Sequence, residues 1–265
     1  MKTIVTSAYR PTAKILAEAE RIAEELDIPF IVRNKRSIEK MHADEQADIL
    51  VAINERLELY PMGKAEPFFF HPNSAAFRTK RPLSSDPLIE VSGLSEGDSF
   101  LDCTMGMASD AITASQHVGA EGKVVGCESN PNIAYVIGTG LQRYNSMPHL
   151  TEAMKRIQVQ AGDSIAYLKA LEENSFDVIY MDPMFTEEIT EASNFSPIRS
   201  SAHMGQLTEE WVEAAKRAAK KAVVLKAHFR SQDFEKFGFT RRVRPNTKFH
   251  YGVIRLNKSS GDLIE

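Results

Sequence analysis

The residues best suited to chemistry lie in the run Asp182-Pro183-Met184-Phe185, directly after the apolar stretch 176–181, which reads as a buried strand. A carboxylate and the carbonyl beside a proline are hydrogen-bond acceptors, and the proline fixes the backbone angle that aims this carbonyl. An aromatic ring two residues after the proline can stack on a flat base, which contributes roughly 1–3 kcal/mol per base in nucleic-acid complexes.

This set of groups suits transfer to an amino nitrogen attached to an aromatic ring. The lone pair of such a nitrogen is delocalised, so the amine is a poor nucleophile until acceptors orient it and push electron density towards it. Positioning and preorganised electrostatics would supply most of the acceleration. The alternative is a simple strand-terminating turn, which an Asp-Pro pair often makes. The sequence therefore predicts catalytic roles for Asp182, Pro183 and Phe185.

Polar residues also lie at or just after the ends of three other predicted strands, at 99–104, 123–129 and 157–163, and a glycine follows the first of them. In a doubly wound sheet, ligands bind outside the carboxyl ends of the strands, so residues at these ends are expected to meet. A carboxylate after the second of these strands can accept hydrogen bonds from ribose hydroxyls, and one after the third from an adenine amino group. The predicted cofactor residues here are Asp102, Thr104, Gly106, Glu128, Ser129, Asp163 and Ser164.

A dinucleotide-binding oxidoreductase is the competing interpretation, but its first turn needs G-x-G-x-x-G to hold a pyrophosphate. The corresponding turn here is T-M-G-M-A-S-D, with a single glycine. A cofactor without phosphate, such as the sulfonium nucleoside S-adenosylmethionine (SAM), does not need that cradle. Taken singly, Gly106 could be an ordinary turn glycine, Glu128 a solvated acid and Asp163 a helix N-cap. Their shared order at the strand ends favours the methyltransferase.

The elements that must position these residues alternate regularly after residue 98, which indicates a parallel sheet covered by helices on both faces. Strands are predicted at 99–104, 123–129, 157–163, 176–182 and 221–227, and helices at 108–118, 131–143, 164–172 and 208–220. A last strand at 249–256 lacks a long preceding helix and is expected to run antiparallel at or near an edge of the sheet.

The front of the chain is predicted to form a separate α/β module over residues 1–75. A Pro- and Ser-rich stretch at 76–98 is typical of a linker, and the main domain is expected over 99–258. Within the module we predict strands at 3–7, 29–34, 47–53, 56–60 and 67–71, a helix that begins near Pro11 and ends before Pro29, and a short helix at 37–46.

The runs FLDCTMGMASDA, GCESNP, DVIYMDPMF, KAVVLKAHF and HYGVI resemble the class I methyltransferase family that contains the small-subunit ribosomal RNA guanine-N2 methyltransferase J. The resemblance covers residues 99–256, and DPMF is that family's form of the broader Asp/Asn-Pro-Pro-Tyr/Phe motif of amino-methyltransferases. It implies SAM as donor, a Rossmann-like seven-stranded sheet with one antiparallel strand, and an exocyclic guanine amine of rRNA as acceptor.

Carried over residue by residue, the resemblance places Asp102, Gly106, Glu128 and Asp163 at cofactor positions, and Asp110 joins them in the first turn. Asp182 and Phe185 fall at the target amine. The first 60 residues, with the opening TSAYRPTA, depart from the shorter N-terminal region of the rRNA enzyme and look closer to a branch of the family found in Gram-positive bacteria.

Basic residues could form a nucleic-acid surface. The stretch 241–258 contains six Lys or Arg and no acid, and Arg78, Lys80 and Arg81 form a second cluster. The alternative is an edge strand protected by charge and a solvated linker. Residues 185–205 make a long connection of the kind that forms lids or substrate loops. His228 is only a weak candidate, because a lone histidine there is more often structural. The predicted substrate contacts are Arg78, Arg199, Lys226 and Arg241.

Composition is that of a soluble globular protein, with 43% hydrophobic and 26% charged residues in 265. A net charge of −4 means that any RNA contact must be a local patch. Two cysteines suggest neither a disulfide framework nor a metal site, and no signal peptide or membrane span is recognisable, so a cytoplasmic location is expected. A homodimer is possible. The alternatives are a methyltransferase for a small molecule or protein, and a non-catalytic nucleotide- or RNA-binding module.

Overall fold

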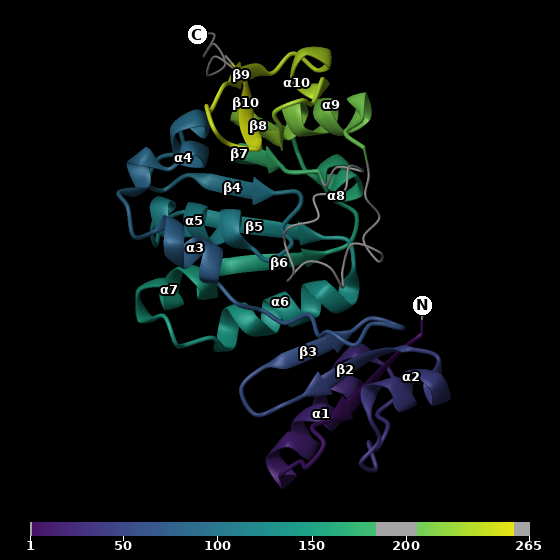
Figure 1. Ribbon diagram of the computed structural model, residues 1–265. Coiled ribbons are helices and arrows are strands. Elements are labelled where there is room, and N and C mark those ends of the chain that lie inside the picture. Colours follow the sequence, from purple (N-terminus) through teal and green to yellow (C-terminus); the bar gives the residue numbers. More distant parts are fainter. Residues whose placement is uncertain (1, 184–205, 257–265) are drawn as a thin grey trace. The chain divides into compact units, whose positions relative to one another are not determined.

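The computed structural model describes residues 2–183 and 206–256, and they divide into two compact units (Figure 1). The first unit contains residues 2–71 and Tyr135–Tyr144, and the second contains the other described residues. The sequence analysis gave roles to Phe185, Arg199 and the connection 185–205, and these lie outside the described residues. Pro183, which was also given a role, is described and is buried.

The first unit is built on a three-stranded sheet in the order β1-β2-β3. Strand β1 (Thr3–Ser7) pairs in parallel with β2 (Asp48–Ala52), which pairs antiparallel with β3 (Leu57–Tyr60). Helix α1 (Ala13–Leu26) begins where the Thr12 side chain accepts a hydrogen bond from the Ile15 amide, and helix α2 (Ile38–Glu45) is capped in the same way by Ser37. These elements match the predicted ones to within a few residues.

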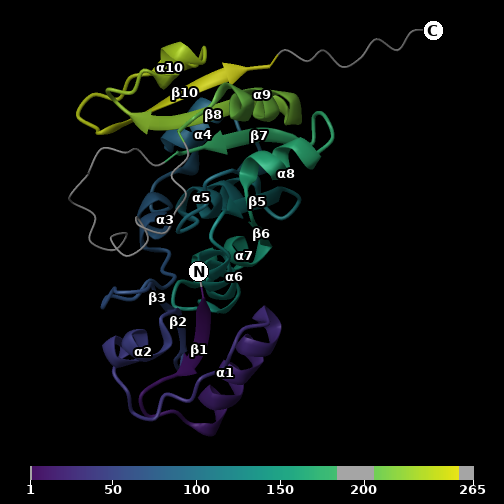
Figure 2. The same cartoon turned by 90° about the vertical axis from the view of Figure 1, so that its right-hand side faces the viewer.

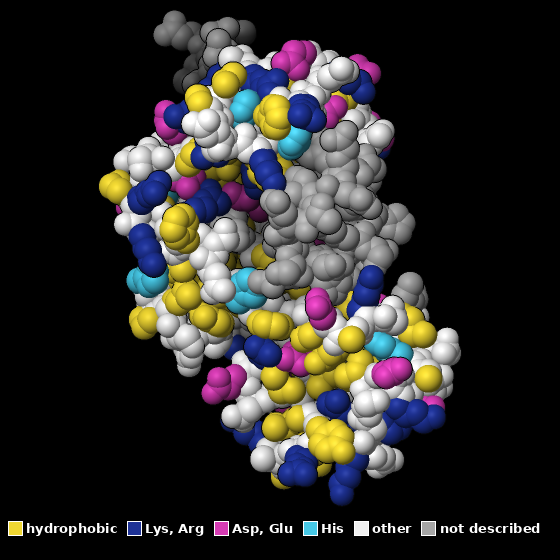
Figure 3. Space-filling model, in the orientation of Figure 1, with side chains coloured by type: hydrophobic (Ala, Val, Ile, Leu, Met, Phe, Trp, Pro, Cys, Tyr) yellow, Lys and Arg dark blue, Asp and Glu magenta, His cyan; other side chains and the backbone are white. Residues whose placement is uncertain are grey.

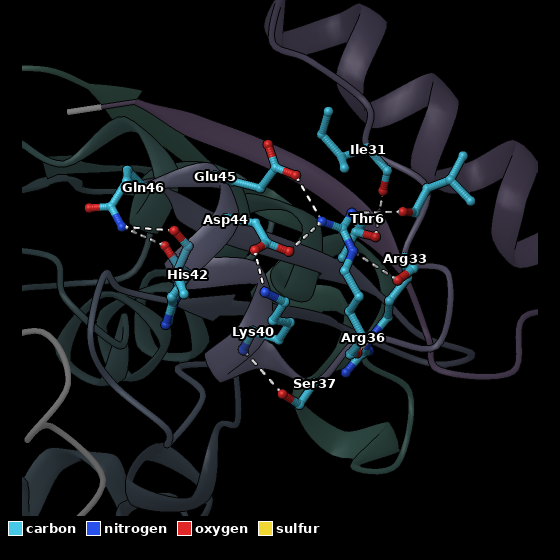
Figure 4. Close-up of polar contacts among 12 residues, drawn as sticks. Thr6, Ile31, Arg33, Arg36, Ser37, Lys40, His42, Asp44, Glu45 and Gln46 are labelled. Carbon is cyan, nitrogen blue, oxygen red and sulfur yellow. Dashed lines mark hydrogen bonds and ion pairs between the residues drawn. The ribbon is translucent and has the colours of Figure 1, made fainter.

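Two predicted strands of this unit, 29–34 and 67–71, are reduced to the isolated bridges Val5–Phe30 and Leu59–Phe68. The backbone of 31–36 turns away because consecutive residues adopt positive φ angles, 47° at Asn34 and 56° at Lys35. Side chains then bond to carbonyls that a strand would have paired, since the Thr6 hydroxyl donates to Ile31 and the Arg36 guanidinium to Val32, at 2.7 and 3.0 Å. Figure 4 shows Thr6 bonded to the Ile31 carbonyl and Arg36 bonded to Asp44 and Glu45 of α2, at 3.2 and 3.0 Å.

The second unit contains the predicted seven-stranded sheet, in the order β6-β5-β4-β7-β8-β10-β9. All neighbours pair in parallel except β10, which is antiparallel to both β8 and β9, so the expected single antiparallel strand is confirmed. The strand order reverses between β4 and β7, which places the ligand-binding crevice at their carboxyl ends. The strands are β4 (Ser99–Asp102), β5 (Lys123–Glu128), β6 (Ile157–Ala161), β7 (Phe176–Met181), β8 (Ala219–His228), β9 (Thr240–Arg242) and β10 (Phe249–Arg255).

Helices cover both faces of this sheet (Figures 1 and 2). On one face, α8 and α9 pack over a core that includes Leu101, Ile179 and Leu225, all fully buried. On the other face lie α4 and α5. The predicted helices are α5 (Ser109–Val118), α6 (Pro131–Arg143), α8 (Ser164–Ala170) and α9 (Glu209–Ala218), whereas α7 (Pro148–Arg156), α10 (Asp233–Lys236) and strand β9 were not predicted.

Residues 76–98 are not a linker, contrary to the sequence prediction. This stretch belongs to the second unit and contains the end of α3 (Asn73–Arg78), a 3-10 turn (Leu83–Ser85) and α4 (Pro87–Ser92). Asp86 caps α4 by accepting from the Leu88 amide, and Pro87 occupies the first helical position, where proline is tolerated. Arg255 of β10 donates to the carbonyls of Val91 and Ser92, at 2.7 and 2.6 Å, which ties α4 to the sheet. No helix among the described residues is long and apolar enough to span a bilayer.

Candidate functional site

The carboxyl ends of β4 and β7 are joined by Thr104. Its backbone N–H donates to the Asp102 carboxylate at 3.0 Å, and its hydroxyl oxygen accepts from the Asp182 backbone N–H at 2.8 Å. Adjacent parallel strands end at the same edge of the sheet, so the two loops meet there. The structure therefore brings together three of the predicted site residues from two distant parts of the sequence.

The end of β5 adds Glu128 to this edge. Its carboxylate accepts from the Asn130 amide at 2.9 Å and from the backbone amides of Gly106 and Ser129, while burial raises its pKa. Gly106 has φ of 46°, in the left-handed region that glycine adopts without strain. The predicted turn glycine thus directs a backbone N–H at the predicted ribose acid.

The end of β6 is attached to the same edge, because the Gly162 amide donates to the Glu128 carbonyl at 2.9 Å. Asp163 is exposed and its carboxylate accepts from the Ala166 amide at 2.8 Å, which makes it the N-cap of α8. This is the alternative role that its sequence context suggested. Ser164, the first residue of that helix, is buried.

Asp182, the first residue after β7, is paired with a lysine. Its carboxylate lies 2.5 Å from the Nζ atom of Lys226 on the neighbouring strand β8. The ammonium group also lies 3.5 Å from Asp110, at the start of α5. Burial lowers and the two carboxylates raise the pKa of Lys226, with a net increase, so the lysine stays charged.

Asp110 is the centre of a partly buried ionic network, in which its own side chain is 13% exposed. It accepts from Arg78 at 2.5 Å and from the Tyr180 hydroxyl at 3.0 Å, in addition to its contact with Lys226. The cations Lys226 and Arg78 hold the pKa of Asp110 well below its usual range in spite of burial. With this set of partners, Asp110 is a structural residue of the site in this structure, and its predicted cofactor contact has no support from its geometry.

The sequence suggested that Arg78 is a surface group that contacts RNA. The structure instead places its guanidinium against acids of the protein itself. Its guanidinium forms a two-pronged contact with Asp86 at 2.8 Å for each pair of atoms and a second contact with Asp110, and its side chain is only 19% exposed. Two carboxylates therefore neutralise it inside the second unit. The physical reason is the helical fold of 73–92, which turns Arg78 inward where a linker would have left it in water.

Arg241 lies on the other face of the sheet from Lys226. In the antiparallel register, Lys226 is opposite Tyr251 and Tyr251 is opposite Arg242, whereas Arg241 is opposite Gly252. Side chains alternate between faces along a strand, so Arg241 and Lys226, both predicted as substrate contacts, point to opposite faces of the sheet. In the basic stretch 241–258, Arg242 pairs with Glu90 at 2.6 Å and Arg255 holds α4, so much of its described charge is structural.

Asp102 is the most unusual acid of the site. Its side chain is 1% exposed, and among the described residues it accepts hydrogen bonds from Thr104 but forms no ion pair. Burial and repulsion by Asp110 and Asp182 raise its pKa to about 8. Burial also raises the pKa of Asp182, against the attraction of Lys226. A positively charged ligand at this edge would be attracted by the Asp182 carboxylate and would favour ionisation of Asp102.

Two residues of the network, Tyr180 and Asp86, were missed by the sequence analysis. Tyr180 precedes Asp182 by two positions in the chain, so strand alternation could have placed both on one face. Asp86 precedes Pro87, a pattern typical of a helix start. Among the described residues, no group of three or more His, Cys, Asp or Glu could hold a metal ion.

Comparisons with known proteins bear on this site. A family model described as "Putative SAM-dependent methyltransferase" matches residues 34–238. Protein YpiP of Bacillus subtilis is 44% identical over 255 residues, which cover 95% of this chain and 99% of that protein. Ribosomal RNA small subunit methyltransferase J of Thioalkalivibrio sulfidiphilus is 31% identical over 156 residues, or 57% of this chain and 60% of that enzyme.

Among solved structures, the SAM-dependent methyltransferase NGO1261 from Neisseria gonorrhoeae superposes with a TM-score of 0.63 at 17% identity, over 98% of this chain and 97% of that one. At this identity the similarity concerns the fold alone. The family model agrees with the predicted class of protein, the solved structure agrees with the predicted fold, and the Bacillus relative agrees with the predicted branch.

Proposed function

The chain belongs to the SAM-dependent methyltransferase family, and from this premise we propose that it methylates an exocyclic amine of a base in ribosomal RNA, with guanine N2 as the acceptor. The observation that carries the proposal is the carboxylate of Asp182, held at the end of β7 beside Asp102 by Thr104 and Lys226. The match to a ribosomal RNA methyltransferase over three-fifths of its length supports the substrate class.

The residues present fit SAM. When bound, SAM supplies an electrophilic methyl group on a cationic sulfonium, next to an ammonium group. Asp102 is a buried acid without an ion-pair partner among the described residues, and a cation bound beside it would favour its ionised form. Glu128, held by three backbone amides at the adjacent strand end, can accept from ribose hydroxyls. We assign Asp102 to the cationic end of the cofactor and Glu128 to its ribose.

Asp182 would accept an N–H of the target amine. A carboxylate offers about four lone-pair directions, so it can accept this hydrogen bond alongside its contact with Lys226. The hydrogen bond from the Asp182 backbone N–H to the Thr104 hydroxyl fixes the backbone position from which the carboxylate side chain extends. Drawing electron density onto the amine nitrogen strengthens its attack on the methyl group, and the methylated cation then sheds its proton readily. Asp182 therefore needs to be ionised but does not need to be a strong base.

Lys226, which the sequence marked as a substrate contact, is a positioning residue in this proposal. Burial and the carboxylate of Asp110 both oppose ionisation of Asp182. The ammonium group at 2.5 Å opposes them and also fixes the orientation of the carboxylate. Arg78 and Tyr180 hold Asp110, which holds Lys226 from the other side.

One observation favours a small-molecule or protein acceptor as the second candidate. Arg78, Arg242 and Arg255 are bound to groups of the protein itself, which removes part of the predicted RNA surface. The test is to compare modified nucleosides, by mass spectrometry, in small-subunit rRNA from cells with and without the gene. Loss of one N-methylated nucleoside, restored by the wild-type gene and not by Asp182→Ala, is expected. Unchanged rRNA would move the acceptor to the second candidate.

A further inference from the structure

Four aromatic side chains gather where β8 ends and β10 begins, and we call His228, Phe229, Phe249 and His250 the aromatic cluster. The ring centroid of His228 lies 4.5 Å from that of Phe229 and 6.3 Å from that of Phe249, and the Phe229 and His250 centroids are 6.3 Å apart. Phe229 is 38% exposed, whereas most large apolar side chains of the described residues are buried. The cluster therefore exposes the ring of Phe229 to solvent and packs it against the neighbouring rings.

Cations surround these rings. The guanidinium of Arg230 lies 5.1 Å from the Phe229 centroid, and Lys226 Nζ lies 5.7 Å from that of Phe249. Arg241 donates to the Phe229 carbonyl and, at 3.0 Å, to His250. An acid, Glu235, contacts Arg241 at 3.5 Å. Figure 3 shows His, Lys or Arg and hydrophobic side chains together on the surface over β10 and α10.

Two rings of the cluster, His228 and Phe249, lie near the proposed catalytic carboxylate. Leu225 of β8 is paired with Met181 of β7, so Lys226 lies level with Asp182 and contacts it. His228 is two residues further along the same strand, or about 7 Å at the usual rise. Its partner in the register is Phe249, whose ring already lies near Lys226. His228 and Phe249 therefore lie on the same face of the sheet as Lys226, and Phe229 follows at the end of β8 with its ring against that of His228.

We propose that the aromatic cluster is the platform on which a single-stranded RNA substrate stacks the nucleotide next to the methylated base. Every base has a flat face that can stack on an exposed ring, and the adjacent phosphate would be neutralised by Arg230. The inference rests on the proposed function for its choice of RNA. Most of the described arginines in the basic stretch 241–258 bind groups of the protein itself. The proposed RNA contact is therefore a smaller set of residues centred on Phe229.

The test uses the full chain and a fluorescein-labelled 12-nucleotide single-stranded RNA of mixed sequence, with binding followed by anisotropy at several salt concentrations. Phe229→Ala should weaken binding roughly tenfold without changing its salt dependence, because it removes stacking and no charge. Arg230→Gln should instead flatten the slope of log K against log salt by about 0.7, the value for one phosphate of a single strand. Phe229→Trp should bind at least as tightly as the wild type.

Phe77→Ala is the matched control, because Phe77 is also an exposed phenylalanine, 64% exposed, with the guanidinium of Arg81 lying 5.9 Å from its ring centroid. It should leave RNA affinity unchanged. Lys236→Gln removes a cation that lies over the Phe237 ring and should leave the salt slope unchanged. The affinity of each variant for SAM, which should equal that of the wild type, checks that the fold is intact.

Equal losses in Phe229→Ala and Phe77→Ala, or wild-type RNA binding by Phe229→Ala, would overturn the platform. The same holds if the wild type does not bind the RNA at all. Methylation assays separate the two proposals. A protein that methylates rRNA but is indifferent to Phe229 refutes only the platform, whereas RNA binding that depends on Phe229 without any methyl transfer to rRNA refutes only the proposed function.

Discussion

Replacing Asp102 by asparagine tests the electrostatics of the site without any substrate. Asparagine keeps the size of the side chain and the oxygen that accepts from Thr104, and removes the charge. Asp102 is buried with a pKa of about 8, whereas aspartate in an unfolded chain titrates near 3.9. At any pH between these two pKa values, Asp102 has lost its proton in the unfolded chain but keeps it in the folded protein. The wild type therefore loses stability as the pH rises from about 4 to about 8.

The magnitude follows from the separation of the two pKa values. Each unit corresponds to about 1.4 kcal/mol, so the cost at pH 7 is on the order of 2–4 kcal/mol, and asparagine avoids it. We expect Asp102→Asn to be more stable than the wild type at pH 7 and pH 8, with an advantage that shrinks towards pH 5. Urea unfolding followed by the fluorescence of Trp211 provides the measurement, because this single tryptophan lies in the core beneath β4 and β7.

Asp177→Asn is the control of opposite sign. Asp177, at the other end of β7, accepts from the amide and hydroxyl of Ser99 and lies near Lys220 and Lys221, and these contacts lower its pKa. Its ionised form therefore stabilises the fold above pH 4, so the variant should be less stable than the wild type by a nearly constant amount from pH 5 to pH 8. An Asp102→Asn variant that is less stable than the wild type at pH 7, or equally favoured at pH 5 and pH 8, would refute the reasoning.

Further predictions concern the cofactor and the reaction. Asp182→Ala should abolish methyl transfer and leave SAM affinity, measured by calorimetry, nearly unchanged; parallel loss of both would remove its proposed role. Glu128→Ala should weaken SAM binding by on the order of 1–3 kcal/mol, and unchanged affinity would place the ribose elsewhere. Lys226→Met should move the acidic limb of the pH profile of kcat/KM to higher pH, since Asp182 would ionise less readily, and Lys226→Arg should restore it in part. Lys221→Met, which breaks the ion pair with Asp98 at the other end of β8, should leave that profile unchanged.

The sequence predicts the strands of the second unit well because each is a buried apolar run that ends in a polar residue. The same pattern predicts that Asp102, Glu128 and Asp182 lie at one edge of the sheet, because the carboxyl ends of neighbouring parallel strands meet there. Short elements were missed for different reasons. Strand β9 has only three residues and no periodicity, whereas α7 has a proline at its start and buried residues at helical spacing, a signal that was present and not used.

Side-chain pairing is the part of the site that the sequence could not reveal. Arg78 and Asp110 are 32 residues apart, and Lys226 and Asp182 are 44 apart, so nothing local marks them as partners. A lysine or arginine near a cleft suggests a substrate contact when it is considered alone. Whether it faces the substrate or a buried acid depends on how helices α3 and α5 pack, which is a property of the tertiary structure.

The charge balance of the network explains why these cations lie inside. With Asp102 protonated in the empty site, the carboxylates of Asp86, Asp110 and Asp182 face only Arg78 and Lys226 among the charged groups that contact them in the described part of the chain, so the strand ends retain excess negative charge. SAM carries one net positive charge, which its demethylated product lacks. Such a site attracts the methyl donor more strongly than the product. The same carboxylates that make the empty site costly to fold thus favour exchange of spent cofactor after each transfer, which is a reason for an enzyme to retain a buried acid without a cation of its own.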